Sequence, residues 1–255
     1  NEACFNVAIR TAHLDREKGQ LEFGVGGGIT WGSSAEGEYA ECLVKAKVLR
    51  TRRPAFGLLE TLLYEDGAFF LLDRHLGRLG HSAEYWGFAC DLIRVRKELE
   101  NVANCMEDSE FRVRLVLSRN GAVEVQSQQV TPPKRLKVAP ASAAVDSADP
   151  FLYHKTTHRA VYEQQLKARP DCDDVVLYNE RGELTECCIG NLVLERDGVR
   201  YTPPVEAGLL AGTFRAELLA QGAIRECALT IDELAGTDAL YLINSVRRWV
   251  ELELT

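Results

Sequence analysis

The sequence has no apolar run long enough to cross a lipid bilayer, and it has no excess of basic residues. Its 255 residues include 30 Lys and Arg against 38 Asp and Glu, which gives a formal net charge of -8. The acidic and basic residues are interspersed, so we expect no basic face of the kind that binds nucleic acid. We also expect no membrane-spanning helix, because such a helix needs about 20 consecutive apolar residues.

Metal-binding cysteine motifs are absent as well. None of the eight cysteines forms a Cys-x-x-Cys pair, and no Cys/His spacing resembles a zinc site. Cys187 and Cys188 are adjacent, so in an extended segment their side chains would point to opposite sides. We therefore expect no metal site, and we expect reduced, mostly buried thiols of the kind found in cytoplasmic proteins.

The beginning of the chain lacks a targeting signal. The first residues have neither the charged nor the apolar region of a signal peptide. The chain does not begin with Met, which indicates a fragment or a processed product. Its 46% of hydrophobic and 27% of charged residues are typical of a globular protein with a sizeable core.

The pattern of strands, helices and turns divides the chain into three parts, residues 1–50, 55–139 and 151–255. A charged segment that ends at Pro54 separates the first two parts. A segment rich in Ala and Ser, from Pro132 to Pro150, connects the last two. The second and third parts each mix helices with strand hairpins, so we expect an α+β fold in two domains.

The first part is too small to fold on its own. It predicts strands at 5–11 and 21–25, a glycine run, and a helix at 38–49 in which apolar residues recur at three- and four-residue steps. Two strands and one helix cannot make a stable core. This part therefore either packs on the rest of the chain or is the end of a domain whose main body is missing.

Hairpin signals and apolar periodicity locate the elements of the other two parts. The second part predicts strands at 58–63 and 68–72, helices at 74–86 and 91–105, and a hairpin of strands 111–117 and 122–125. The third part predicts strands at 174–178, 191–195, 199–201, 228–231 and 239–243 and a helix at 212–220. One face of the helix at 74–86 carries His75, Leu76, Leu79, Ser82, Ala83 and Trp86.

Lys155 lies in a cluster of basic and hydroxyl residues, from His154 to Arg159. A lysine can bond to an aldehyde cofactor and then move protons at the α-carbon of the substrate. For this role its pKa must fall, and burial or a neighbouring cation would lower it. Thr156, Thr157 and Arg159 are suitable neighbours. The alternative is an exposed loop lysine, which is the commoner situation for this residue type.

Glu186 follows a turn in a segment where polar and apolar residues alternate. A carboxylate next to the ring nitrogen of an aldehyde cofactor such as pyridoxal phosphate keeps that nitrogen protonated, and the ring can then accept electrons. Glu186 could fill this role, with Glu183 as a more exposed competitor. The alternative for Glu186 is an edge-strand carboxylate that faces water.

A phosphate group requires N–H donors, and the beginning of a helix supplies them. The segment from Gly208 to Arg215 offers glycines, a hydroxyl and then a helix. Ser245 offers a second hydroxyl after a strand, and Arg78 could complete the site with a cation. The alternative reading of the Gly-Thr pair is an ordinary helix cap.

In this order, these segments resemble the fold-type IV (class IV) pyridoxal-phosphate enzymes, which include branched-chain and D-amino-acid aminotransferases and 4-amino-4-deoxychorismate lyase. The resemblance runs from about Phe56 to Trp249. Its segments are Phe56-Gly57 with Glu60-Thr61, His75-Leu76-Gly77-Arg78-Leu79 with Ser82-Ala83, the Lys155 cluster, Leu184-Thr185-Glu186 with Asn191-Leu192, Gly212-Thr213-Phe214-Arg215 and Asn244-Ser245.

The resemblance implies a role for each candidate residue. Lys155 resembles the Schiff-base lysine, and Glu186 resembles the partner of the pyridine nitrogen. Arg78, the amides of Thr213 and Phe214, and Ser245 resemble the groups that bind the cofactor phosphate. The implied fold is like that of D-amino-acid aminotransferase, with a small domain at 55–139 and a larger, cofactor-binding domain at 151–255. Family members are usually homodimers, so a homodimer is expected.

The first part resembles the C-terminal end of chorismate-utilising enzymes such as aminodeoxychorismate synthase component I. Arg10 matches a substrate-carboxylate arginine there, and Glu38 and Glu41 match magnesium-binding glutamates. Gly32 replaces an aspartate that is often found after the Gly-Gly-Gly strand. Only the last fifty or so residues of that domain are present, so the resemblance implies that this domain is inactive here.

Within the class IV family, the segment from Thr185 to Leu192 is similar to the version found in the lyase. The resemblance therefore implies elimination of pyruvate from aminodeoxychorismate to give 4-aminobenzoate for folate biosynthesis, with the rest of the synthase chain as a candidate partner. One alternative is an aminotransferase for branched-chain or D-amino acids, with Arg112, Arg114 and Arg159 as candidates for binding the substrate carboxylate. The other is a non-catalytic fragment.

Overall fold

The computed structural model describes residues 11–50, 54–106, 109–132 and 134–255. The chain forms two separate units, and the division lies between Pro54 and Ala55. Within the described ranges, no helix is both long enough and apolar enough to span a membrane.

The first unit contains one hairpin and one helix. β1 (Ala12–Asp15) pairs antiparallel with β2 (Gln20–Phe23), and α1 (Ala35–Arg50) follows. The predicted helix at 38–49 is confirmed and begins earlier than expected. The predicted strand at 5–11 lies almost entirely outside the described residues.

Large apolar side chains of this unit remain exposed. They include Leu14, Leu21, Ile29, Trp31, Tyr39, Leu43 and Val44. A two-stranded hairpin with a single helix has too little surface to cover such side chains, as the sequence indicates. The described part of this unit therefore has no buried core of its own.

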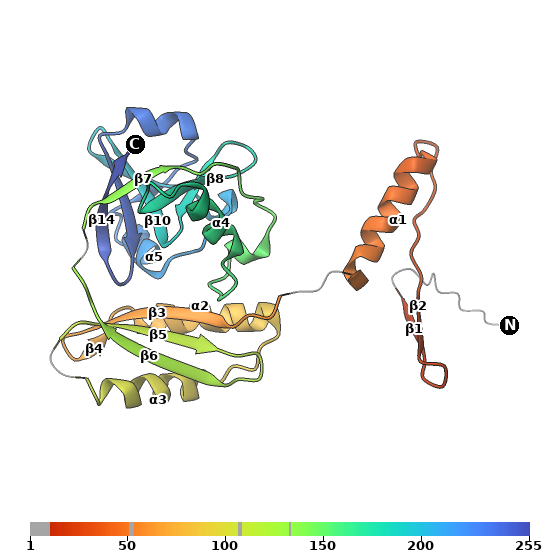
Figure 1. Ribbon diagram of the computed structural model, residues 1–255, viewed down its shortest axis with the longest axis horizontal. Helices are drawn as coiled ribbons and strands as arrows, with labels where there is room; N and C mark the ends of the chain where they lie inside the picture. Colours follow the sequence, from red (N-terminus) through yellow and green to blue (C-terminus); the bar gives the residue numbers. More distant parts are fainter. Residues whose placement is uncertain (1–10, 51–53, 107–108, 133) are drawn as a thin grey trace. The chain divides into compact units, whose positions relative to one another are not determined.

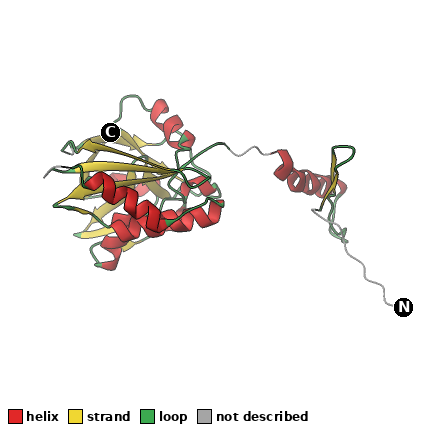
Figure 2. Ribbon diagram, turned by 90° about the horizontal axis from the view of Figure 1, so that it is seen from below, coloured by secondary structure: helices red, strands yellow, loops and turns green. Residues whose placement is uncertain are grey.

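The second unit contains a four-stranded sheet in the order β4-β3-β5-β6. Its strands are β3 (Leu58–Glu65), β4 (Ala68–Phe69), β5 (Phe111–Leu117) and β6 (Val123–Gln129). Two helices, α2 (Leu72–Trp86) and α3 (Leu92–Ala103), pack with the alternate residues of β5 in one apolar cluster, and Figure 2 looks onto helices that cover the strands. The sheet therefore has one face under helices and one face available for other contacts.

Local signals explain where these helices begin and end. The Asp91 carboxylate accepts hydrogen bonds from the amides of Ile93 and Arg94, which caps the first turn of α3. Gly87 ends α2 with a φ of 67°, in the left-handed region that favours glycine. The face of α2 predicted from the sequence is the buried one, from His75 to Trp86.

The larger sheet has the strand order β12-β11-β10-β13-β14-β7-β8-β9, and β9 also pairs with β10. This second pairing closes six strands into a barrel, which Figure 1 shows as a layer separate from the four-stranded sheet. The barrel strands are β7 (Leu136–Pro140), β8 (Asp174–Tyr178), β9 (Leu184–Cys187), β10 (Gly190–Arg196), β13 (Ala239–Asn244) and β14 (Arg248–Leu254). β11 (Val199–Thr202) and β12 (Arg225–Glu226) extend the sheet beyond β10.

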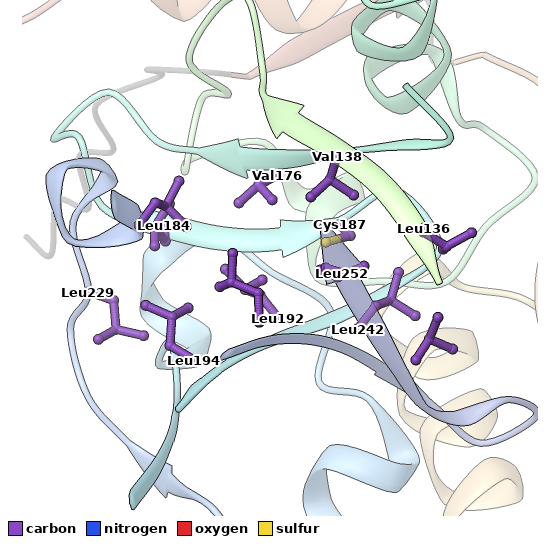
Figure 3. Packing of buried hydrophobic residues seen from close by; sticks show 13 residues of the cluster. Leu136, Val138, Val176, Leu184, Cys187, Leu192, Leu194, Leu229, Leu242 and Leu252 are labelled. Atoms are coloured by element: carbon purple, nitrogen blue, oxygen red, sulfur yellow. The ribbon is translucent and has the colours of Figure 1, made fainter. Parts of the chain in front are cut away.

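All six barrel strands contribute to one apolar cluster, of which Figure 3 labels Leu184, Leu192 and Leu242 among others. Cys187 belongs to this cluster, while Cys188 packs in another with α4 (Ala160–Ala168). The prediction that these two side chains point to opposite sides is therefore confirmed. α5 (Thr213–Ala220) packs on β10 and β13 through a further cluster. The α+β class expected from the sequence is confirmed.

Some predicted elements are wrong. The segment between Pro132 and Pro150, expected to be only a connection, contains β7, which pairs in parallel with both β8 and β14. The strand predicted at 68–72 ends at Phe69, because Leu71 takes a left-handed conformation and α2 begins at Leu72.

The strand predicted at 228–231 is also wrong. Thr230 and Glu233 form a reciprocal capping box that starts a short 3₁₀ helix, Ile231–Gly236. The cysteines differ from the prediction in one respect. The seven described cysteines are free, but only Cys187 and Cys188 are buried.

Candidate active site

A cavity of about 260 Å³ lies where the four-stranded sheet meets the barrel. Its walls come from β3 and β5, the Lys155 segment, the β9–β10 turn, the beginning of α5 and the turn that follows β13. Among the described residues that line it, five are cations, Lys155, Arg78, Arg112, Arg159 and Arg247, and one is a carboxylate, Glu186. Such a cavity favours ligands with several negative charges.

The backbone of the Lys155 segment is attached to β3. The Leu59 amide donates to the Lys155 carbonyl at 2.9 Å, and the Thr157 amide donates to the Gly57 carbonyl at 2.9 Å. The Thr157 hydroxyl accepts from the Gly57 amide, also at 2.9 Å. A Cβ at Gly57 would lie 2.7 Å from a methyl group of Val116, so a larger residue there would displace its neighbours in β5. These bonds fix Lys155 in the cavity wall.

The environment of Lys155 makes its neutral amine more accessible than that of an ordinary lysine. Burial, and then the nearby charge of Arg78, lower the pKa of Lys155 to about 8. Lys155 is partly buried as a residue, and it lines the cavity. The expectation of an exposed loop lysine is therefore not met. An amine with this pKa can act as a nucleophile and can exchange protons near neutral pH.

Glu186 is a buried carboxylate at the cavity. It accepts hydrogen bonds from the Tyr162 hydroxyl at 2.8 Å and from the Asn191 amide at 3.3 Å. Burial raises the pKa of Glu186 to about 7, although the hydroxyl of Tyr162 acts in the opposite direction. The alternative of an edge-strand carboxylate in water is excluded, since Glu186 is only 4% exposed.

Arg78 projects from α2 and is held by Glu60 of β3. The guanidinium donates to both carboxylate oxygens, at 2.9 and 2.7 Å, and it also donates to the Ala211 carbonyl at 3.2 Å. Burial alone would raise the pKa of Glu60, but the charge of Arg78 and the hydrogen bond from His75 outweigh it, and the pKa falls to about 2. Glu60 is therefore ionised throughout the physiological range.

The beginning of α5 faces the cavity with Gly212 and Thr213. No side chain caps this helix, so the first amides, including those of Thr213 and Phe214, are available to an anion. A Cβ at Gly212 would lie 2.0 Å from the Asn191 side-chain oxygen, so a larger residue there would have to displace the Asn191 side chain. Ser245 lies in the cavity wall after β13.

The residues present fit pyridoxal phosphate. At one end, the uncapped beginning of α5 and Arg78 provide N–H donors and a positive charge for a phosphate. Elsewhere in the wall, the buried Glu186 would balance the positive charge of a protonated ring nitrogen. Lys155 lies in the same cavity with a lowered pKa. A phosphate, a cationic ring and an aldehyde would thus each find a matching group.

Other residues singled out in the sequence have different surroundings. Thr156 is buried and bonds to the backbone of His158, so it stabilises the loop. Glu183 lies outside the cavity wall and pairs with Arg181 at 2.7 Å. Of the three arginines considered for a carboxylate, Arg112 and Arg159 line the cavity and Arg114 does not.

Glu38 and Glu41, which resemble magnesium-binding glutamates, contact other side chains of the first unit. Glu41 pairs with Lys45 at 2.6 Å, and Glu38 accepts a hydrogen bond from the Ser33 hydroxyl at 2.6 Å. Lys45 also donates to the Gly26 carbonyl at 2.7 Å. Arg10 lies outside the described residues.

Several residues of the site were not assigned a role from the sequence. They are Tyr162, Asn191, Glu60, His75 and Arg247. Glu60 and His75 fall within segments that carry the family resemblance, but only their partners reveal what they do. A buried position on a predicted helix face was the one available signal for His75, and that signal is equally typical of a packing residue.

Comparison with known proteins identifies two regions. Residues 57–253 match the family described as amino-transferase class IV, and residues 1–51 match the family described as chorismate binding enzyme. A Schizosaccharomyces pombe protein named "Putative aminodeoxychorismate lyase" is 34% identical over 206 residues, which cover 75% of this chain and 86% of that protein.

Solved structures give the same picture for the second unit. A Mesorhizobium loti structure named "Putative amino-acid aminotransferase" has 36% identity and a TM-score of 0.74, and the match covers 78% of this chain and all of that one. A Mycobacterium tuberculosis "hypothetical aminotransferase", solved with alpha-ketoglutarate and PMP, has 25% identity and a TM-score of 0.67. That match covers 78% of this chain and 81% of the other.

Proposed function

The chain belongs to the class IV aminotransferase family, and from this premise we propose that it is a pyridoxal-phosphate enzyme that splits 4-amino-4-deoxychorismate into 4-aminobenzoate and pyruvate. The observation that carries the proposal is the position of Lys155, which lies in one cavity with the uncapped beginning of α5 and the buried Glu186. This arrangement suits an amine substrate held on an aldehyde cofactor.

The cations of the cavity support a substrate of this class. Aminodeoxychorismate carries two carboxylates and the cofactor carries a phosphate, and five cationic side chains face them. We propose that Arg112, Arg159 and Arg247 bind the two carboxylates, while Arg78, the amides of Thr213 and Phe214, and Ser245 bind the phosphate. The match of residues 1–51 to chorismate binding enzymes supports a substrate derived from chorismate.

Pyridoxal phosphate, when bound, supplies an aldehyde that joins the substrate amine and a ring that draws electrons from the carbon bearing that amine. Lys155 removes the proton from the substrate ring carbon that bears the amine. The lowered pKa of Lys155 leaves it neutral often enough to do so. Glu186 would balance the positive charge of the protonated ring nitrogen. The carbon–oxygen bond to the enolpyruvyl group then breaks, its electron pair leaves with the oxygen, and the enolpyruvate takes up a proton to become pyruvate.

Binding and positioning are the main tasks that remain for the protein. Aromatisation of the product ring favours the elimination, so the cavity needs only to orient the ring carbon toward Lys155 and to keep water away from it. Leu59 and Ile189 contribute apolar surface to the wall. Arg159, which donates to the Cys188 carbonyl, fixes the turn that carries Ile189.

An aminotransferase for branched-chain or D-amino acids is the second candidate. The likeness to the Mesorhizobium loti protein favours it, because that protein's name describes an amino-acid aminotransferase. Arg112 and Arg159 would then bind an α-carboxylate. The two candidates share the roles of Lys155 and Glu186 and differ in the substrate.

Formation of 4-aminobenzoate from aminodeoxychorismate tests the proposal. We expect production by the wild-type protein loaded with pyridoxal phosphate, and a loss of about 10³-fold or more in Lys155→Ala. Lys134→Ala changes an exposed lysine outside the cavity and is the matched control. Transamination of an amino acid with a keto acid, without any 4-aminobenzoate, would instead establish the second candidate. Full activity in Lys155→Ala would overturn both.

We also propose a homodimer, as in related enzymes, and the remainder of a synthase chain as a partner of the first unit. The exposed apolar side chains of residues 11–50 support such a partner. Light scattering of the purified protein would test the first proposal. Binding of a separately expressed chorismate-binding domain, measured with and without residues 1–50 on this chain, would test the second.

A further inference from the structure

The groups proposed to bind the phosphate share a common support. Glu60 holds Arg78 through two hydrogen bonds from the guanidinium, at 2.9 and 2.7 Å. Bidentate pairing of this kind fixes the plane of the guanidinium as well as its position. The Nη1 that remains is directed at Ala211, two residues before α5. Arg78 is thus aimed at the beginning of that helix.

His75 makes the second connection. Its Nδ1 lies 2.7 Å from Glu60, and its Nε2 lies 3.2 Å from the hydroxyl of Thr213, the first residue of α5. The ring has no exposed surface, and burial lowers its pKa, so the neutral form is favoured. In the neutral form, Nδ1 donates to Glu60 and Nε2 accepts from Thr213.

Thr61 makes the third connection. Its carbonyl accepts a hydrogen bond from the Ser245 hydroxyl at 3.3 Å. Side chains alternate along β3, so Glu60 points toward α2 while Thr61 lies in the cavity wall. Two consecutive residues of β3 therefore support three groups of the site. Glu60 bonds to Arg78 and, through His75, to Thr213, and Thr61 bonds to Ser245.

We propose that Glu60 and His75 are positioning residues for the cofactor phosphate: Glu60 aligns Arg78, and His75, through the Thr213 hydroxyl, aligns the first amides of α5. The inference rests on the proposed function. Stability alone is a poor reason for this network, because a buried ion pair is often no more stabilising than a well-packed apolar pair. Exact alignment of charge at an anion site explains the network better. At metal sites, losing the residues that hold the binding groups in place lowers affinity about 10- to 100-fold.

A comparison of two ligands separates alignment of the phosphate from general stability. Pyridoxal phosphate and pyridoxal share the ring and the aldehyde, and only the first carries a phosphate. We expect Glu60→Gln and His75→Asn to weaken binding of pyridoxal phosphate about 10- to 100-fold and to change binding of pyridoxal by less than about threefold. The visible absorbance of the lysine-linked ligand in titrations of cofactor-free protein gives both affinities.

The variants separate the two contacts of His75. Asparagine places its side-chain amide near the position of Nδ1 and can still reach Glu60, whereas glutamine extends toward the position of Nε2 and can reach Thr213. We expect His75→Gln to recover part of the affinity that His75→Asn loses. Glu84→Gln and His81→Asn change exposed residues of the same helix and are the matched controls.

Three outcomes decide the question. Equal weakening of both ligands would indicate a merely structural role and overturn the inference. Unchanged affinity in Glu60→Gln and His75→Asn, together with weakened binding in Arg78→Lys, would also overturn it and leave the proposed function intact. If Arg78→Lys and Lys155→Ala bind pyridoxal phosphate as the wild type does, the cofactor site itself is wrongly placed. Should Glu60→Gln fail to fold, His75→Asn keeps the Glu60–Arg78 pair and still decides the test.

Discussion

Two buried glutamates, Glu186 in the cavity wall and Glu60 behind Arg78, have opposite properties. Glu60 is 3% exposed and Glu186 is 4% exposed, so their burial is nearly equal. Yet the pKa of Glu60 falls to about 2, and that of Glu186 rises to about 7. The difference lies in their hydrogen-bond donors. Glu60 receives two bonds from a guanidinium, whereas Glu186 receives its bonds from the neutral Tyr162 and Asn191.

This comparison shows that the charge of the neighbours, more than the depth of burial, sets the state of a buried carboxylate here. Glu60 is a permanent anion and is suited to holding a cation in place. Glu186 lies near the balance between its neutral and charged forms, so a cation that arrives in the cavity would change its state. The first glutamate suits a support and the second suits a direct partner of a ligand.

The largest expected difference between the two glutamates is in how each changes the free energy of unfolding with pH. Glu60 has a folded pKa below its ordinary 4.5, so its contribution is present above pH 4.5 and is lost as the pH falls toward 2. Glu186 has a folded pKa above 4.5, so it costs stability as the pH rises from 4.5 to about 7. Each shift corresponds to about 3 kcal/mol.

In cofactor-free protein, we therefore expect Glu60→Gln to lose about 3 kcal/mol at both pH 5 and pH 8. Glu186→Gln should gain less than about 1 kcal/mol at pH 5 and about 3 kcal/mol at pH 8. Urea unfolding at the two pH values measures both. The same pH profile in the two variants would show that the comparison is wrong.

Catalysis should depend on the charge of Glu186 more than on its shape. Replacing Glu186 by Gln keeps the volume and removes the negative charge that would face the ring nitrogen. We expect kcat for 4-aminobenzoate formation to fall about 10²-fold with a smaller change in KM. Glu183→Gln, a change at a partly exposed carboxylate paired with Arg181, is the control. Equal activity of the two variants would exclude Glu186 from the reaction.

Tyr162 should have a smaller effect through the same carboxylate. Tyr162→Phe removes a donor that stabilises the charged form of Glu186, so the pKa of Glu186 should rise above 7. A hydrogen bond to a charged group contributes about 1.5 kcal/mol, which corresponds to about one pH unit. Titration of carbon-13-labelled glutamate followed by NMR would measure the shift, with Tyr85→Phe on exposed α2 surface as the control.

The smallest effect is expected where the carboxylate is exposed. Asp73 pairs with Arg96 at 2.5 Å, but the Asp73 side chain is 89% exposed. Water screens such a pair, so Asp73→Asn should change the free energy of unfolding by less than about 0.5 kcal/mol. Thermal unfolding of Asp73→Asn, compared with that of Glu60→Gln, would test this contrast. A loss as large as that of Glu60→Gln would mean that burial has little influence on these pairs.

Much of the fold could be predicted from the sequence because its signals are local. The buried face of α2, the hairpin of β5 and β6, and the glycine before α5 each depend on residues that are close in the chain. β7 could not be found in this way. Its hydrogen bonds come from β8 and β14, and its Ala and Pro residues resemble those of a linker.

The residues of the site also fall into those that the sequence could predict and those that it could not. Lys155 and Glu186 were candidates because their residue types and order are informative, and the structure places both at one cavity. The roles of Glu60 and His75 could not be predicted, because they depend on contacts with Arg78 and with Thr213, the latter 138 residues away from His75. Tyr162 was missed for a similar reason, since its partner lies 24 residues further along the chain.

The attachment of the Lys155 segment to β3 has a consequence for attempts to divide the enzyme. A chain cut in the connection between β6 and β7 would give two pieces, and the piece that carries Lys155 would lose the strand whose Leu59 amide holds it. The other piece would keep Arg78 and Glu60 but no lysine. Neither piece could react alone, so proteolysis at this connection should leave activity only while the two pieces remain bound to each other.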